Sequence, residues 1–234
     1  MEKRIWELDA LRGICILGVV LVHFVYDLVE MYAIVDWEYP QWFAFIKDWG
    51  GILFLLISGI SVTLGHRSVR RGLIVLAAGA LITLVTYGMY RLDMTDQGII
   101  IYFGVLQCLG CCMILWWLFR HLPNWALVLL GSAMVWAGMY LYTVTLVDDP
   151  WLLPFGFTFP GFQTSDYFPL LPHLGFFLLG AVLGRTVYRK KQTLLPCVKE
   201  SNPIVRFLSF CGRQSLWIYL LHQPILTGIC MLLL

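Results

Sequence analysis

The chain has 234 residues, of which 60% are hydrophobic and only 13% are charged, and its mean hydropathy is +0.79. These values lie outside the usual range of a soluble globular domain and predict an integral membrane protein. The basic residues alternate from loop to loop and do not gather on one groove with stacking aromatic side chains, which excludes nucleic acid as a partner.

The apolar runs predict an all-α, polytopic transmembrane helix bundle of about seven spans. A span needs about 20 apolar residues, so residues 1–234 form a single transmembrane domain with no room for a separate soluble one. The second run is short, and we expect its helix to extend back through Phe43, Phe45 and Ile46. The predicted spans are Leu11–Val29, Gly50–Leu64, Gly72–Tyr90, Gly98–Phe119, Trp125–Val147, Phe168–Val187 and Ser215–Leu234.

Lys and Arg predominate in every second loop, and such loops stay on the cytoplasmic side of a membrane. The pattern predicts a cytoplasmic N-terminus and a C-terminus outside, which requires an odd number of spans. The basic residues are Lys3, Arg4, Arg12, Arg67, Arg70, Arg71, Arg120, Arg185, Arg189, Lys190, Lys191, Lys199, Arg206 and Arg213. The acidic residues of the intervening loops are Asp36, Glu38, Asp48, Asp93, Asp96, Asp148, Asp149 and Asp166.

The first predicted helix contains the strongest functional signal. At 100° per residue, Asp9, Arg12, His23, Asp27 and Glu30 fall within an arc of about 60°. An ionisable group near the bilayer centre costs at least ~2.5 kcal/mol, so this stripe must face the protein interior or a water-filled cavity. The structural alternative is a set of interhelical ion pairs, with the first two residues marking the cytoplasmic interface.

His23 and Asp27 are four residues apart, which brings their side chains together on one helix face. A carboxylate there can orient the imidazole, giving the pair of groups that removes a proton from a hydroxyl or amine nucleophile. Arg12 lies about 16 Å toward the cytoplasm along the helix. That separation suits a donor molecule with a charged head at the inner face and a reactive end deep in the membrane.

A second cluster, Arg67, Arg70 and Arg71, follows the second span. The fork of an arginine side chain matches the oxygens of a phosphate group. The alternative is that these charges only reflect the cytoplasmic bias of basic residues.

Further polar side chains lie in the later predicted spans. Gln107 is in the fourth and His173 is near the start of the sixth, while Ser215, Tyr219 and His222 share one face of the last. We interpret them as candidate pocket residues, with hydrogen bonding between helices as the structural alternative.

Three other segments carry predictions. The aromatic loop Val147–Phe168 either folds back over the bundle or forms an interfacial aromatic belt. The amphipathic stretch Ile204–Phe210 predicts a helix on the cytoplasmic membrane surface. Cys108 and Cys111 have the spacing of zinc ligands, but no second ligand pair accompanies them, so we expect no metal.

Four segments together resemble the bacterial relatives of the heparan-alpha-glucosaminide N-acetyltransferase catalytic domain. The wider similarity is to the transmembrane acyltransferase superfamily, including acyltransferase family 3. The Arg of that family's first helix and the His eleven positions later are matched by Arg12 and His23, and its RxxR element is matched by Arg67 and Arg70. The four segments are LDALRGICILGVVLVHFVYD, SGISVTLGHRSVRR, FGVLQCLG and GRQSLWIYLLHQP, spread over nearly the whole chain.

The resemblance implies that acyl-CoA enters from the cytoplasm and that a sugar amine or hydroxyl acceptor approaches from the other side. We expect the acyl group to be acetyl and the location to be a bacterial cytoplasmic membrane. In the lysosomal members the proposed catalytic histidine lies in the first outer loop, but here no histidine occurs between Phe24 and Gly65. His23 is therefore the best candidate for the catalytic histidine.

The resulting hypothesis is a membrane-bound acyltransferase that uses acetyl-CoA as co-substrate and is surrounded by membrane lipid. One alternative is a proton-coupled transporter of a small metabolite, because intramembrane His and Asp also serve proton relays. Another is a non-catalytic membrane partner of the same fold. The sequence does not decide between a monomer and a homo-oligomer, or between direct transfer and a covalent acyl-histidine. The predicted roles are general base for His23, its orienter for Asp27, CoA binding for Arg12, Arg67, Arg70, Arg71 and Gln107, and substrate binding for His222, Tyr219 and His173.

Overall fold

The computed structural model describes residues 4–144, 147, 149–198 and 200–233. Lys3, Asp148 and Lys199, which contribute to the predicted membrane orientation, lie outside the described residues, as does the side chain of Asp48. The same holds for residues 145–146 and 234 at the ends of two predicted spans.

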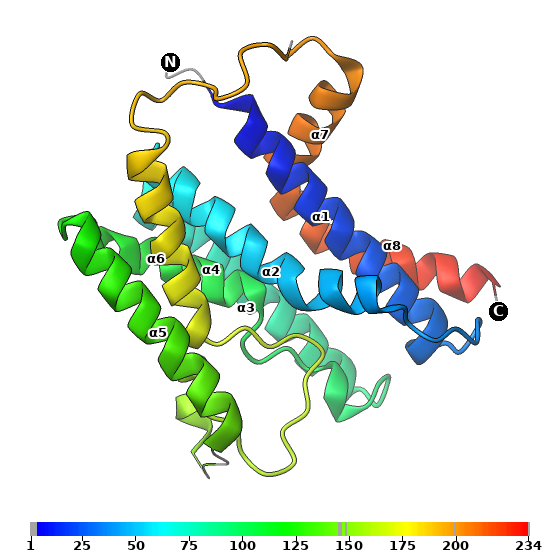
Figure 1. Cartoon of the computed structure of the whole chain (residues 1–234). Helices are drawn as coiled ribbons and strands as arrows, with labels where there is room; N and C mark the ends of the chain where they lie inside the picture. Colours follow the sequence, from blue (N-terminus) through cyan, green and yellow to red (C-terminus); the bar gives the residue numbers. More distant parts are fainter. Residues whose placement is uncertain (1–3, 145–146, 148, 199, 234) are drawn as a thin grey trace. The chain divides into compact units, whose positions relative to one another are not determined.

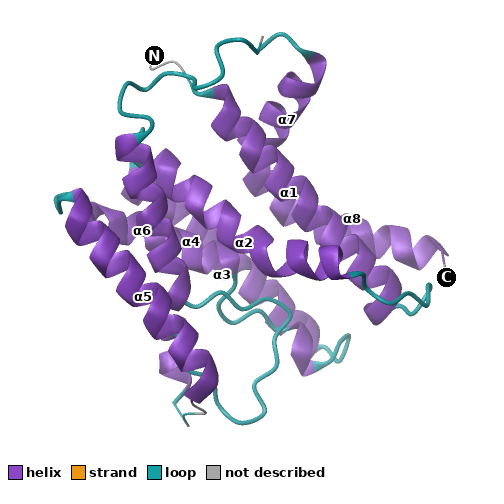
Figure 2. Cartoon of the chain, in the orientation of Figure 1, coloured by secondary structure: helices purple, strands orange, loops and turns teal. Residues whose placement is uncertain are grey.

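The described part of the chain consists of helices and loops, with no strand (Figure 2). This confirms the predicted all-α class. The α-helices are α1 (Trp6–Tyr26), α2 (Gln41–Val62), α3 (Ser68–Arg91), α4 (Val105–Phe119), α5 (Asn124–Val144), α6 (Leu170–Thr186), α7 (Pro203–Arg213) and α8 (Ser215–Leu233). A π-helical turn, η1 (Asp27–Met31), continues α1, and two 3-10 turns are η2 (Gln97–Ile99) and η3 (Pro150–Phe155).

Five helical segments among the described residues are long and apolar enough to cross a membrane: Trp6–Met31, Gln41–Val62, Ser68–Arg91, Asn124–Leu141 and Ser215–Leu233. The helices α4 and α6 are also apolar but have only 15 and 17 residues. The number of seven spans therefore stays a prediction. The beginning of α2 at Gln41 confirms the predicted extension of the second span, and α7 confirms that the amphipathic stretch is helical.

The predicted fourth span is too long, because α4 begins at Val105 and not at Gly98. The backbone before it bonds to the loop that precedes α6. The N–H of Phe168 donates to the carbonyl of Phe103 at 2.9 Å, and the N–H of Val105 donates to a carboxylate oxygen of Asp166 at 3.0 Å. These bonds satisfy backbone groups that would otherwise be unpaired in an apolar setting. They also show that the end of the aromatic loop, at Asp166 and Phe168, folds back against the start of α4.

The chain forms two compact units. Unit 1 comprises Met1–Ile57 and Lys190–Leu234, and unit 2 comprises Ser58–Arg189. In unit 1, α7 and α8 pack against α1, whereas in unit 2, α3 packs on α4 and both α4 and α5 pack on α6 (Figure 1). The predicted single domain stays a prediction.

Glycines let helices approach closely within each unit. A Cβ atom on Gly212 of α7 would collide with the carbonyl oxygen of Asp9 on α1. A Cβ atom on Gly72 of α3 would lie 2.8 Å from the carbonyl oxygen of Gly110 on α4. Such contacts between small residues are a common basis of helix packing in membranes, where the hydrophobic effect does not drive helices together.

Candidate functional site

The polar stripe of the first helix is only partly turned inward. Asp9 and Asp27 are buried, Arg12 and His23 are half-buried, and Glu30 is exposed. The prediction of a buried stripe is therefore confirmed for the two aspartates and wrong for Glu30. The reason is that the backbone changes from α-helical to π-helical at residue 27, which alters the direction of the side chains that follow.

Two imidazole rings face each other in unit 1. The ring centroids of His23 on α1 and His222 on α8 are 4.8 Å apart, with an interplanar angle of 81°. Nδ1 of His23 bonds to the carbonyl of Val19 at 2.9 Å, and Nδ1 of His222 bonds to the carbonyl of Tyr219 at 2.6 Å. Because a carbonyl only accepts, Nδ1 carries the proton of each neutral ring and Nε2 keeps its lone pair. The pair thus presents two basic nitrogens.

Some polar atoms beside these rings lack a partner. Nε2 of His222 and Oε1 of Gln223 are buried, and neither has a hydrogen bond within the described part of the chain. An unsatisfied buried polar atom costs about 1–3 kcal/mol, so native proteins keep few of them. The ring of Tyr219, 5.3 Å from that of His222, completes what we call the histidine cluster: His23, Asp27, Tyr219, His222 and Gln223.

Asp27 contacts α8 as well as the turn of α1 that precedes it. Its carboxylate is fully buried, and each oxygen accepts a hydrogen bond of 3.0 Å from Nε2 of Gln223. Among the described residues no hydrogen bond or ion pair joins it to His23, four residues earlier. The ring of His23 is thus oriented by a backbone carbonyl, and Asp27 supplies a negative charge close to it. A carboxylate so placed stabilises an imidazolium ion.

Arg12 forms an ion pair with a residue of its own helix. Its Nη1 donates to Asp9 at 3.2 Å, its side chain is only 15% exposed, and Asp9 also lies 3.9 Å from Nε of Arg4. Asp9 and Arg12 thus form an ion pair within α1, whereas the structural alternative predicted ion pairs between helices. The predicted contact of Arg12 with a CoA phosphate stays a prediction.

Gln107 belongs to a completed hydrogen-bond network in unit 2. Its Nε2 donates to the carbonyl of Gly79 at 3.0 Å and to the hydroxyl of Thr83 at 2.8 Å, and its Oε1 accepts from the N–H of Gly104 at 3.1 Å. We call these four residues the Gln107 network. The amide joins α3 to α4 with all its groups engaged, which favours the structural alternative over CoA binding.

His173 is also in unit 2, where it is buried near the start of α6. Its Nδ1 bonds to the carbonyl of Pro169 at 2.7 Å, and its ring lies 4.8 Å from that of Phe168. As in the histidine pair, Nε2 is left as the basic nitrogen. A role in substrate binding stays a prediction.

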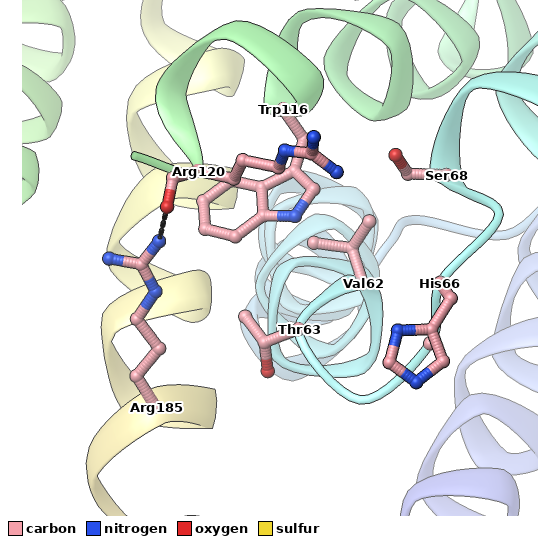
Figure 3. Close-up of a pocket in the computed structure, with 8 residues that line it drawn as sticks. Val62, Thr63, His66, Ser68, Trp116, Arg120 and Arg185 are labelled. Atoms are coloured by element: carbon pink, nitrogen blue, oxygen red, sulfur yellow. Dashed lines mark hydrogen bonds between the residues drawn. The ribbon is translucent and has the colours of Figure 1, made fainter. Parts of the chain in front are cut away.

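The predicted arginine cluster surrounds the first turn of α3. Arg67 precedes the helix, Arg70 and Arg71 lie in its first turn, and all three are exposed. A cavity of about 230 Å³ lies beside this turn (Figure 3). We call it the arginine pocket, and its polar lining consists of Thr63, His66, Ser68, Arg120 and Arg185, with Trp116 as an aromatic wall.

The sequence reasoning did not single out Arg120 and Arg185 as site residues. Both were counted only as basic residues of cytoplasmic loops. That charge pattern was the available signal, because it places them on the same predicted membrane side as Arg67. The described residues include no group of three or more His, Cys, Asp or Glu side chains that could hold a metal ion.

No curated protein and no solved structure gives a significant match to this chain. A family model does match, and its description is heparan-alpha-glucosaminide N-acetyltransferase, catalytic. The match covers residues 4–224 and so includes both units almost completely. Together with the helices that can cross a membrane, it identifies an integral membrane protein with the fold of an acetyltransferase family. The chain belongs to the heparan-alpha-glucosaminide N-acetyltransferase catalytic-domain family.

Proposed function

We propose that the chain is a membrane-bound acyltransferase that moves an acetyl group from cytoplasmic acetyl-CoA to the amine or hydroxyl of a sugar acceptor. The observation that carries this proposal is the edge-to-face contact of His23 with His222, together with the buried carboxylate of Asp27 four residues after His23. Family membership supports acetyl transfer and does not favour a transporter or a non-catalytic partner.

In this proposal His23 is the general base. The acceptor amine or hydroxyl attacks the thioester carbonyl carbon, a new C–N or C–O bond forms, and Nε2 of His23 takes the proton that the acceptor loses. The C–S bond then breaks and the proton passes to the leaving sulfur, so the products are the acetylated acceptor and CoA thiol. Asp27 stabilises the transient imidazolium, and His222 offers a second basic nitrogen beside the ring that changes charge.

The donor is held in this proposal by Arg67, Arg70 and Arg71. Their exposure leaves them accessible to solutes, and the amide groups at the start of a helix also favour anions. Arg12, which pairs with Asp9, is proposed as a further contact for a CoA phosphate. Tyr219, in contact with His222, is proposed to meet the acceptor.

We also propose that α4 and α6 cross the membrane, which gives seven spans in a bacterial cytoplasmic membrane with a cytoplasmic N-terminus and an external C-terminus. Their lengths of 15 and 17 residues are close to the lower limit of about 17 for a span. Cys197 is exposed in the basic segment before α7. A membrane-impermeant maleimide should therefore label it only after the cells are permeabilised, and labelling of intact cells would reverse the orientation.

The test of the function uses the purified full chain in lipid nanodiscs with acetyl-CoA and glucosamine, and mass spectrometry of the products. We expect N-acetylglucosamine to form, and His23→Ala to lower the rate by about 10²–10⁴-fold. Gln192→Ala is the control, since this exposed residue lies outside the histidine cluster and the arginine pocket. Full activity in His23→Ala would exclude the proposed base, and bound CoA without transfer to any sugar amine or hydroxyl would exclude the enzyme.

A further inference from the structure

The arginine pocket of unit 2 is formed where four helix ends meet. Thr63 follows α2, Ser68 begins α3, Trp116 and Arg120 lie at the end of α4, and Arg185 lies near the end of α6. Its volume of about 230 Å³ is below the roughly 300–1,000 Å³ of a pocket that encloses a whole small molecule. The pocket therefore fits one chemical group of a larger ligand.

The lining is cationic without a compensating acid. His66, Arg120 and Arg185 contribute basic side chains, and no Asp or Glu belongs to the lining. The sequence segments that supply it, residues 58–72, 113–124 and 178–189, contain no acidic residue at all. Two guanidinium groups and no carboxylate in the lining of a partly enclosed site favour an anionic group.

Arg185 has a structural role in this pocket. Its guanidinium donates to the carbonyl of Leu122 at 2.8 Å, to Oδ1 of Asn124 at 3.2 Å and to the carbonyl of Arg120, and it stacks 4.8 Å from the ring centroid of Trp116. Because these oxygen acceptors are neutral, the charge of Arg185 remains. Its bonds also fix the backbone that carries Arg120.

Arg120 and Ser68 supply the groups that can contact a ligand. In Figure 3 the guanidinium of Arg120 and the hydroxyl of Ser68 point toward one another across the pocket. Nε of Arg120 donates to His121 at 3.1 Å, and the guanidinium lies 5.8 Å from the ring centroid of Trp117. No hydrogen bond or ion pair in the described part of the chain engages its terminal nitrogens. Two terminal N–H groups aimed into a cavity are the donors that a phosphate takes in bidentate fashion.

We propose that the arginine pocket binds the 3′-phosphate of CoA through Arg120, Ser68 and His66. This inference rests on the proposed function, which makes acetyl-CoA the donor. A terminal phosphate monoester can enter a small pocket, whereas the diphosphate of CoA is attached at both ends and suits the exposed Arg67, Arg70 and Arg71 at the start of α3. The packing of Arg71 against Gly65, a lining residue, brings the two sets of basic groups together, since a Cβ there would lie 3.3 Å from Nη1 of Arg71.

The test compares CoA with 3′-dephospho-CoA, which lacks only this phosphate. Binding to the full chain in nanodiscs is measured by titration calorimetry. We expect the wild-type chain to bind CoA at least about tenfold more tightly than dephospho-CoA, since a charge-assisted bond of the kind lost contributes that much. Arg120→Gln should remove the preference for CoA and leave the affinity for dephospho-CoA unchanged.

A second variant separates binding from folding. Ser68→Asp places a negative charge in the pocket and also in the first turn of α3, where an acidic side chain stabilises the helix. We expect its thermal stability to be kept while CoA binding weakens by at least about tenfold and dephospho-CoA binding does not. Arg206→Gln in unit 1 is the matched control for loss of one positive charge. It lines a different cavity, which contains Glu200, and should keep the preference for CoA.

Equal wild-type affinities for CoA and dephospho-CoA would overturn the proposal, and so would a preference that persists in both Arg120→Gln and Ser68→Asp. An acetyl-transfer assay distinguishes failure of the phosphate-site proposal from failure of the proposed acetyltransferase function. Transfer that is equally efficient from acetyl-CoA and acetyl-dephospho-CoA would keep the acetyltransferase and exclude the phosphate site. Absence of binding to either compound would exclude both.

Discussion

The histidine cluster of unit 1 and the Gln107 network of unit 2 differ in how completely their polar groups are paired. In the Gln107 network, both the amide oxygen and the amide nitrogen have partners on the backbone or on a hydroxyl. In the histidine cluster, Nε2 of His222 and Oε1 of Gln223 are buried without a partner among the described residues. Both clusters lie in apolar helices, so the cost of an unpaired group is similar in each.

The difference teaches which cluster can take part in chemistry. A completed network specifies how two helices pack and has no capacity for another ligand. An incomplete one costs stability and can accept a proton or a bound molecule. The two glutamines show this difference directly. The side-chain amide of Gln107 has partners for its oxygen and its nitrogen, whereas the amide oxygen of Gln223 has none among the described residues.

The largest expected stability change comes from Gln107→Leu. It leaves the N–H of Gly104 and the carbonyl of Gly79 without their side-chain partner, and the free energy of unfolding should fall by roughly 3 kcal/mol. Acetyl transfer per folded molecule should stay within about twofold, because the network is complete without a substrate. Thermal unfolding in detergent and a transfer assay check this. A Gln107→Leu variant that is stable but inactive would indicate that Gln107 takes part in CoA binding.

Asp27→Asn tests the charge of the histidine cluster. An asparagine can pair with both amide groups of Gln223 and give its unpaired oxygen a donor, so the free energy of unfolding should rise by about 1 kcal/mol. Without the negative charge beside His23, transfer should fall by about 10–100-fold, which is roughly 1.4–2.7 kcal/mol in the barrier. We therefore expect Asp27→Asn to raise the free energy of unfolding and to lower the rate of acetyl transfer. A stabilised variant with full activity would show that the charge is dispensable.

His222→Leu is the direct counterpart of Gln107→Leu. It removes the unpartnered Nε2 and also the bond of Nδ1 to the carbonyl of Tyr219. Because these two effects oppose each other, the free energy of unfolding should change by less than about 1 kcal/mol. The rate of acetyl transfer should fall by about tenfold if His222 shares the proton of His23. The measurement is the same pair of assays. A loss of stability as large as that of Gln107→Leu would mean that the histidine cluster is structural as well.

The apolar runs were sufficient to predict the helices and the all-α class, because lipid requires long apolar segments. They could not predict where α4 begins. The segment 98–104 is apolar enough to continue the helix, but its backbone bonds to residues such as Tyr167 and Phe168. The π-helical turn at Asp27 was missed for a similar reason, since nothing local in the sequence requires it.

Helix periodicity could predict which residues of the candidate site share a face of one helix, but not their partners on other helices. The four-residue spacing predicts that His23 and Asp27 share one helix face, but their side chains bond elsewhere, to the carbonyl of Val19 and to Gln223. It could not identify Gln223, which lies 196 residues away in sequence and holds the carboxylate. Likewise, Gln107 could not be distinguished from a ligand-binding residue until its partners, 24 and 28 residues earlier, were known.

The smallest expected change in stability comes from replacing Gly79, which lies against Gln107. A Cβ atom on Gly79 would lie 2.9 Å from Cδ of Gln107, whereas one on Gly88 of the same helix would meet nothing within 4 Å. Gly88→Ala should therefore stabilise the chain by up to about 1 kcal/mol through helix propensity, and Gly79→Ala should lack this gain. Thermal unfolding of the two variants measures the difference.

The mechanism of that difference can itself be tested. Because Gly79→Ala acts by displacing the amide of Gln107, its effect should approach that of Gly88→Ala once Gln107 is replaced by alanine. Such non-additivity is expected for residues in direct contact and not for Gly88 with Gln107. Equal effects of Gly79→Ala in both backgrounds would mean that the helices α3 and α4, and not the amide between them, resist the added atom. Acetyl transfer should be unchanged in every variant, since none of them alters the histidine cluster.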